Sequence, residues 1–198
     1  FSVVNWDGDG STGTVGTGLS SVDFIISKCA SQETDWAVWT SSFSDPTEYL
    51  ALNLSNASSL QPSVISGAPT GGVVPLGGNG NYNTNMIMYA WKETPGVSSF
   101  GTYVGNQPNP TGVIECGFKP AFVMVKDTEN VSNGEWFIWD DARGEDNYLC
   151  PNLALAENNV SVGPRNYPVE FTSTGFKIIA ADATNVNATG HTFIYAAF

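Results

Sequence analysis

The sequence predicts an all-β protein, and three observations favour this fold class. Short runs rich in Val, Ile, Phe, Trp and Tyr alternate with clusters of Gly, Pro, Asn and Asp, as strands alternate with tight turns. The 198 residues include 21 Gly and 11 Pro, and no segment has the apolar periodicity of a long helix. The third observation is an internal repeat of about 99 residues.

The two halves of the chain, residues 1–99 and 100–198, align with shifts of only a few residues. We therefore predict two homologous domains with these boundaries, joined by a short connector that contains a Pro-Gly turn signal at Pro95-Gly96. The matched segments are Phe24–Lys28 with Phe122–Lys126, Trp36–Trp39 with Trp136–Trp139, Tyr49-Leu50 with Tyr148-Leu149, Gly72–Leu76 with Gly175–Ile179, and Asn83–Ala90 with Asn187–Ala196.

The pattern within each repeat predicts an antiparallel β-sandwich of the jelly-roll or lectin-like kind, because the expected strands are short and are separated by regular turn signals. The run Phe122–Val125 is apolar on both faces, which is typical of a central strand, whereas Thr192–Tyr195 alternates more clearly. Two arrangements stay open. The repeats are either two packed sandwiches or one larger sandwich with pseudo-twofold symmetry.

Composition excludes several classes of partner. With 7 basic and 19 acidic residues the formal net charge is -12, which repels both a nucleic-acid backbone and an anionic membrane surface. No apolar run is long enough for a transmembrane helix, and no signal-peptide pattern is present. The three cysteines, Cys29, Cys116 and Cys150, cannot all pair within one chain, so we expect buried thiols.

Two features of the sequence contain residue types that catalytic sites use. The single histidine, His191, lies in a strand-like run without a nucleophile-elbow serine, so we interpret it as a half-exposed strand histidine. The acidic loop Asp140–Asp146 contains four carboxylates around Arg143, and a glycosidase requires a pair of such groups. We favour a solvated turn with an Asp–Arg pair, and we expect neither an enzyme nor a cofactor.

Asp7 and Asp9 alternate with glycines, as the first ligands of a calcium loop do. The twelfth position of such a loop would be Gly18 instead of a bidentate acid, so we predict an Asp-Gly turn and no metal, with Ca²⁺ as the alternative.

Aromatic rings beside amides and carboxylates occur in several predicted loops. A ring face packs against the apolar face of a sugar while amides and acids bond its hydroxyls. The alternative is that these rings cap the ends of the core. The candidate ligand-binding residues are Trp6, Asp7, Asp9, Asn81, Tyr82, Tyr103 and Asn106.

Three motifs resemble a domain of unknown function that recurs in the tail proteins of marine and cyanobacterial phages: Cys116–Lys126, Trp136–Arg143 and Asn187–Phe198. The segment Tyr89–Tyr103 resembles the central part of the same family, so the resemblance covers nearly the whole chain. It implies a virion protein of the tail fibre, made in the bacterial cytoplasm, with a tendency to form homotrimers and to contact other tail proteins. It implies no catalytic residue.

The leading functional hypothesis is an adhesion module that binds host-surface glycans without catalysis. Multivalent presentation on a trimeric fibre would make weak individual contacts effective. A purely structural fibre, collar or capsid-decoration domain is the first alternative. The second is a glycan depolymerase that uses the Asp140–Asp146 loop.

Overall fold

The computed structural model describes residues 1–130, 134–157, 169–179 and 184–198. The protein is all-β with antiparallel sheets, as predicted, and the chain divides into two compact units. Unit 1 comprises Phe1–Leu52 and Ser58–Glu93, and unit 2 comprises Asn53–Ala57 and Thr94–Phe198. The boundary follows Glu93, earlier than the alignment of the two halves suggests. Among the described residues, no helix has the length and apolar character needed to span a membrane.

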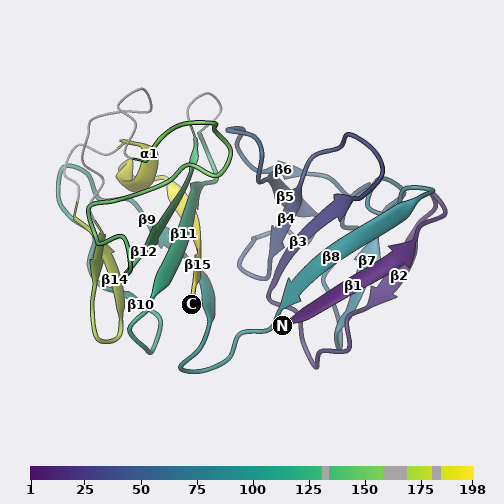
Figure 1. Cartoon of the computed structure of the whole chain (residues 1–198), viewed down its shortest axis with the longest axis horizontal. Coiled ribbons are helices and arrows are strands. Elements are labelled where there is room, and N and C mark those ends of the chain that lie inside the picture. Colours follow the sequence, from purple (N-terminus) through teal and green to yellow (C-terminus); the bar gives the residue numbers. More distant parts are fainter. Residues whose placement is uncertain (131–133, 158–168, 180–183) are drawn as a thin grey trace. The chain divides into compact units, whose positions relative to one another are not determined.

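Unit 1 contains a six-stranded sheet and a two-stranded sheet (Figure 1). Side chains from both sheets meet in one core cluster, in which Ile25, Trp39 and Met88 of the larger sheet join Val15 and Val74 of the smaller one. The larger sheet has the order β1 (Ser2–Asp7), β8 (Asn85–Trp91), β3 (Phe24–Cys29), β4 (Ala37–Thr40), β5 (Glu48–Ala51) and β6 (Ser59–Leu60), and the smaller sheet pairs β2 (Gly13–Gly16) with β7 (Val73–Leu76).

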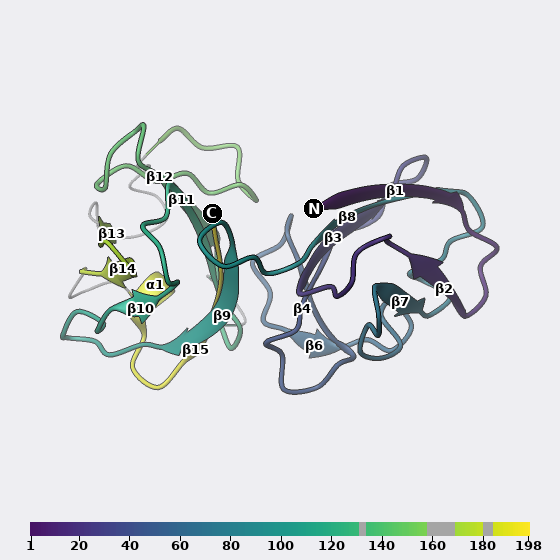
Figure 2. The same ribbon diagram turned by 90° about the horizontal axis from the view of Figure 1, so that it is seen from below.

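Unit 2 contains a four-stranded sheet and a three-stranded sheet, which form two layers in Figure 2. Its core is richer in aromatic side chains, and Phe137, Trp139, Phe176 and Phe193 are all fully buried there. The larger sheet has the order β12 (Trp136–Asp140), β11 (Phe122–Asp127), β15 (Thr192–Ala197) and β9 (Ser99–Val104), the smaller one has the order β10 (Ile114–Glu115), β14 (Gly175–Ile178) and β13 (Val169–Phe171), and the short helix α1 is Thr184–Asn187.

The two units share a strand order. In unit 1 the order β4-β3-β8-β1 corresponds to β12-β11-β15-β9 in unit 2, and the pair β2–β7 corresponds to β10–β14. In each unit the last strand of that unit pairs with its first strand on one side and with its third strand on the other, and every one of these pairings is antiparallel. We use "corresponding" below for positions that occupy the same place in these pairings.

The pairing register corrects one detail of the sequence alignment. Ala90 pairs with Ser2 and Ile25, while Ala197 pairs with Ser99 and Val123, so Ala90 corresponds to Ala197. The sequence comparison had placed Ala90 over Ala196, one residue away. Successive side chains of a strand point to opposite faces, so that alignment would exchange core and outer residues. Met88 and Ala90 lie in the core of unit 1, as their counterparts Tyr195 and Ala197 do in unit 2.

A close backbone contact follows the first strand of each unit. Gly8 N donates a hydrogen bond to Thr84 O at 2.9 Å, and Gly105 N donates one to His191 O at 3.0 Å. A Cβ atom added at Gly8 would lie 2.0 Å from the Tyr82 carbonyl oxygen, and one at Gly105 would lie 2.0 Å from the Ala188 carbonyl oxygen. Only glycine allows the two backbone segments to approach this closely.

A buried asparagine holds the turn beyond each of these glycines. The Asn81 carbonyl oxygen accepts a hydrogen bond from Gly10 N at 2.6 Å, and the Asn187 carbonyl oxygen accepts one from Gln107 N at 3.1 Å. Asn81 therefore corresponds to Asn187, whereas the sequence alignment had matched Asn187 with Asn83. We call each pair, Gly8 with Asn81 and Gly105 with Asn187, a glycine–asparagine contact.

Substitution of either contact glycine by alanine is expected to destabilise the protein. Because the added Cβ meets backbone and not a flexible side chain, Gly8→Ala and Gly105→Ala should each lower the free energy of unfolding by about 2 kcal/mol or more, measured by urea denaturation. Gly16→Ala and Gly112→Ala are the matched controls, since a Cβ there meets nothing within 4 Å. The controls should change stability by less than about 1 kcal/mol. Equal losses in both pairs would contradict the steric explanation.

Candidate functional site

A cavity of about 220 Å³ opens in unit 1 beside the end of β3. Its walls come from β3, β4, β5 and the start of β8, together with the loops that contain Gln61 and Tyr82. The lining is mixed, because apolar groups such as Val64 and Met86 lie among polar ones. The polar side chains in the lining include those of Ser27, Asp35, Tyr49, Gln61, Asn79 and Tyr82.

The cavity exists where unit 1 has smaller side chains than unit 2. The pairings make Ala37 correspond to Phe137 and Ser27 correspond to Val125. Phe137 and Val125 are fully buried in the core of unit 2. Replacing a phenylalanine by an alanine removes most of a side chain, and the surrounding fold rarely closes the space completely.

A tyrosine that both units share shows the effect of this difference. Tyr49 in β5 corresponds to Tyr148, because their neighbours Leu50 and Leu149 pair with equivalent residues of the preceding strand. In unit 2 the Tyr148 ring is buried against Phe137, with the ring centroids 5.4 Å apart. In unit 1 position 37 is alanine, and the half-buried Tyr49 lines the cavity instead.

An acid and a second tyrosine line the cavity together with Tyr49. Burial raises the pKa of the Tyr49 hydroxyl, and the nearby Asp35 carboxylate and Tyr82 add to this increase. Both neighbours also line the cavity. Two phenol rings and a carboxylate therefore lie together in one partly enclosed space.

Lys28 is the cation at the cavity wall, and its ammonium group is committed to the adjacent loop. It donates to Thr34 O at 2.7 Å, to Thr34 Oγ1 at 3.2 Å and to Gln32 O at 3.2 Å. An ammonium group has three N–H donors, so these three acceptors account for all of them. Lys28 thus holds the loop between β3 and β4 in place.

Of the predicted ligand-binding residues, Tyr82 lies at this cavity. Tyr49, Gln61 and Asn79 also line it, although the pattern of aromatic and amide residues in loops did not predict them. A signal existed in the alignment of the repeats, in which alanine at position 37 stands opposite Phe137. That difference predicts missing volume, but only the strand pairing shows that both positions face the core.

Three of the predicted ligand-binding residues, Trp6, Asp9 and Asn81, are joined by hydrogen bonds to one another. Trp6 Nε1 donates to Asn81 Oδ1 at 2.8 Å, and Asn81 Nδ2 donates to Asp9 Oδ1 at 2.8 Å. The Ser11 hydroxyl and backbone N–H also donate to Asp9 Oδ1, and they hold the pKa of Asp9 below its usual value. Asn81 is only 8% exposed. These groups stabilise the turn after β1, while Asp7 ends β1 as an exposed residue.

The calcium alternative at Asp7 and Asp9 gains no support from this arrangement. Asp9 Oδ1 is occupied by hydrogen bonds within the turn. In the part of the chain that the structure describes, no three His, Cys, Asp or Glu side chains are grouped so that they could hold a metal ion.

Tyr103 and Asn106, the two predicted residues in unit 2, also have structural roles. The Tyr103 ring is 8% exposed, stacks on Phe193 at a centroid distance of 4.9 Å, and its hydroxyl donates to Val186 O at 2.6 Å. Little of its ring surface is therefore accessible to a ligand. Asn106 is exposed, and its backbone N–H donates to Asn187 Oδ1 at 2.8 Å.

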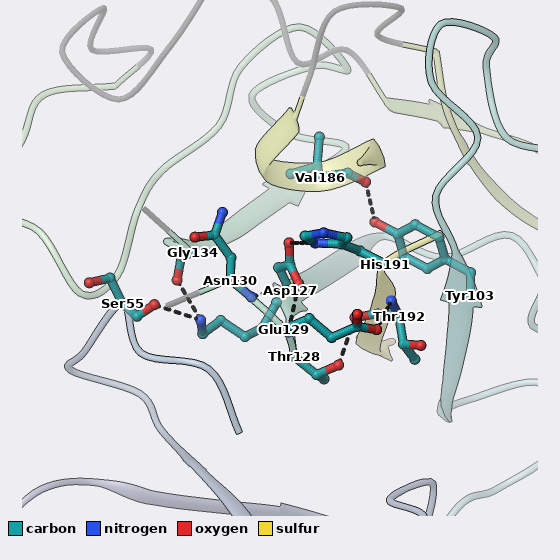
Figure 3. Close-up of polar contacts among 11 residues, drawn as sticks. Ser55, Tyr103, Asp127, Thr128, Glu129, Asn130, Gly134, Val186, His191 and Thr192 are labelled. Atoms are coloured by element: carbon teal, nitrogen blue, oxygen red, sulfur yellow. Dashed lines mark hydrogen bonds and ion pairs between the residues drawn. The ribbon is translucent and has the colours of Figure 1, made fainter. Parts of the chain in front are cut away.

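Unit 2 holds a buried carboxylate beside the single histidine (Figure 3). Asp127, at the end of β11, is fully buried, and its carboxylate lies 2.9 Å from His191 Nδ1. The backbone N–H groups of Glu129 and Asn130 donate to its other oxygen at 2.8 and 3.2 Å. His191 precedes β15 and its side chain is 37% exposed. The pair fixes the turn after β11 against the start of β15.

Lys126, the neighbour of Asp127, is a buried lysine. Its Nζ donates to Ser55 O at 3.1 Å and to Gly134 O, and Ser55 belongs to the Asn53–Ala57 segment of unit 2. Burial lowers the pKa of Lys126 to about 8, against the opposing influence of Asp127 and Glu135. The ammonium group of Lys126 therefore lies in a buried environment that disfavours its charged form.

This lysine predicts a specific dependence of stability on pH. Its folded pKa of about 8 lies below the usual 10.5, so the unfolded chain binds more protons between these values. The destabilisation is fully present below pH 8 and is relieved as the pH rises toward about 10.5, by up to ~3 kcal/mol. Urea unfolding at pH 7 and pH 10 should show this rise in the wild type relative to Lys126→Met. An equal pH dependence in both proteins would contradict the assignment.

The acidic loop after β12 holds its neighbours together. Asp140 binds Arg143, with 2.6 Å between Oδ2 and Nη2, and these hydrogen bonds hold the pKa of Asp140 below its usual value. Glu145 Oε1 accepts a hydrogen bond from Phe171 N at 2.8 Å, which ties the loop to β13. A glycosidase acid needs a carboxyl group with a raised pKa. Asp140 and Glu145 instead accept hydrogen bonds from neighbouring groups, as the carboxylates of a structural turn do.

The cysteines are all thiols, and two of them are buried. Burial raises the pKa of Cys150 to about 12, and nearby Glu135 contributes. Since the thiolate is the nucleophile, Cys150 should resist iodoacetamide at pH 8 in the folded protein, whereas the half-buried Cys116 should react first. Peptide mass spectrometry after a short exposure would show the order, with urea-unfolded protein as the control in which all three react. Early labelling of Cys150 would disprove this burial.

The fold and the cavity define an all-β protein of two-sheet units with a partly enclosed cavity whose lining is mixed. The chain belongs to the family described as "Domain of unknown function (DUF7483)", whose model matches residues 1–198. No curated protein and no solved structure matches the chain.

Proposed function

We propose that this protein is a carbohydrate-binding adhesion module without catalytic activity, and that the sugar binds in the cavity of unit 1. The observation that carries the proposal is the cavity itself, which brings Tyr49 and Tyr82 together with the amides of Gln61 and Asn79. Phenol rings offer apolar faces to a sugar ring, and amides bond its hydroxyls as donors and acceptors. Ser27 adds a hydroxyl where the corresponding residue of unit 2 is Val125.

The proposed architecture is a pair of β-sandwiches that arose by duplication. The shared strand order and the two glycine–asparagine contacts support a common origin. In this proposal unit 2 supplies a filled core and unit 1 supplies the ligand site, because the same positions carry large side chains in one and small ones in the other.

The proposed setting is a phage tail fibre, on the basis of the motif resemblance described above. A fibre that is a homotrimer would present several copies of the cavity to a host-surface glycan. Linking binding events in this way raises the apparent affinity by orders of magnitude without new contacts, so a shallow site with weak intrinsic affinity suffices.

Filling the cavity should abolish sugar binding. Ala37→Phe introduces the side chain that unit 2 carries at the corresponding position, and we expect at least a ten-fold loss of binding to a glycan array when the protein is presented on multivalent beads. Tyr82→Ala should also weaken binding, because it removes one ring face. Stability should fall by no more than about 3 kcal/mol, the usual cost of overpacking.

Ala142→Phe is the matched control, because it makes the same substitution at an exposed position of unit 2. It should bind glycans as the wild type does. The proposal fails if the multivalent wild-type protein binds no glycan on the array, or if folded Ala37→Phe binds as well as the control.

A further inference from the structure

We infer that the unit 1 cavity selects sugars by charge and prefers neutral or amino sugars to those that carry a carboxylate. This inference rests on the proposed function and specifies the class of ligand. It follows from three observations on the charged groups at the cavity.

The first observation is the acid at the cavity wall. Asp35 is an exposed residue that lines the same cavity as Tyr49, and its charge contributes to the raised pKa of the Tyr49 hydroxyl. A ligand that contacts Tyr49 therefore also experiences the charge of Asp35. A second carboxylate in the same space would be repelled, while a hydroxyl or an ammonium group would be attracted.

The second observation concerns the only lysine in the lining. An anionic sugar needs a cation that can donate to it, and Lys28 is the candidate. Its three hydrogen bonds, to two oxygens of Thr34 and to Gln32 O, already use the three donors of the ammonium group. Recruiting Lys28 to a ligand would require breaking the contacts that order the loop between β3 and β4.

The third observation is the charge of the surrounding unit. Unit 1 carries eight acidic side chains and two lysines, so its field adds to the repulsion of an anion as it approaches. The Asp35 carboxylate, the hydrogen-bonded Lys28 and the net negative charge of unit 1 all disfavour the binding of a sugar that carries a carboxylate.

The experiment compares sugars of the same ring stereochemistry that differ in charge through one functional group. The full chain, presented on beads, is tested against neoglycoproteins that carry a hexose, the matching hexosamine and the matching hexuronic acid in the gluco, galacto and manno series. Within the series that binds, we expect the hexuronic acid to bind about ten-fold more weakly than the hexose, the ratio that about 1.4 kcal/mol produces. High salt should reduce the difference, because this site is partly open to solvent.

Two variants test whether the charge of Asp35 causes the preference for the hexose over the hexuronic acid. Asp35→Asn keeps the shape of the side chain and removes its charge, so the preference for the hexose over the hexuronic acid should largely disappear. Asp35→Glu keeps the charge and should keep the preference. Circular dichroism of both variants checks that they fold.

The outcomes separate the two proposals. Binding that depends on Ala37 but ignores the charge of the sugar, or a preference that survives Asp35→Asn, would overturn the inference and leave the glycan site intact. Absence of binding to every neutral and amino sugar, with tight binding of a hexuronic acid, would also overturn it. If no probe binds at all, both the site and its selectivity are rejected.

Discussion

The structure depends on the way each unit is closed by its last strand. β8 lies between β1 and β3, and β15 lies between β9 and β11, so strands far apart in sequence are joined only when the last one is in place. Side chains alternate along this strand, and its register therefore decides which residues of three strands face the core. The glycine–asparagine contact fixes the register from outside the sheet, because it holds the turn after the first strand against the segment that leads into the last one.

The same frame supports two different interiors. In unit 2, Phe137, Phe193 and Tyr148 fill the end of the core. In unit 1 the positions that correspond to the two phenylalanines are Ala37 and Met86, and the remaining space is the cavity. Strand pairing and the glycine–asparagine contact tolerate the replacement of large core side chains by small ones, because both are formed by backbone groups. Core volume can therefore change in one unit while its topology stays the same.

The fold class could be predicted from the sequence because turn residues and β-branched runs act locally. The alignment of Trp36–Trp39 with Trp136–Trp139 also identified strands that occupy equivalent places in the two units. The sequence alignment of β8 with β15 was wrong by one residue, because it matched the identical residues Tyr89 and Tyr195. Only the pairing on both sides, which is not local, shows that Met88 corresponds to Tyr195.

The candidate site was less predictable, and the reason is physical. Aromatic and amide residues in loops form the same sequence pattern whether they face solvent or brace a turn. Asn81 and Tyr82 are neighbours, yet Asn81 is buried in hydrogen bonds while Tyr82 lines the cavity. The different environments of Asn81 and Tyr82 depend on Gly8. This glycine lets the backbone after β1 lie close to the Tyr82 carbonyl group, which fixes the orientation of the Asn81-Tyr82 segment.

The chemically distinctive groups of both units lie at one corner of the common frame. Cys29 and Thr84 in unit 1 correspond to Asp127 and His191 in unit 2, so the buried acid–imidazole pair stands where the other unit has the cavity wall. Backbone hydrogen bonds continue through this corner in both units, from Ala30 N to Asn85 O and from Thr128 N to Thr192 O, and they do not depend on which side chains are present. Side chains can change there without loss of strand pairing, and the specialisation of each unit therefore reaches into core-facing positions as well as loops.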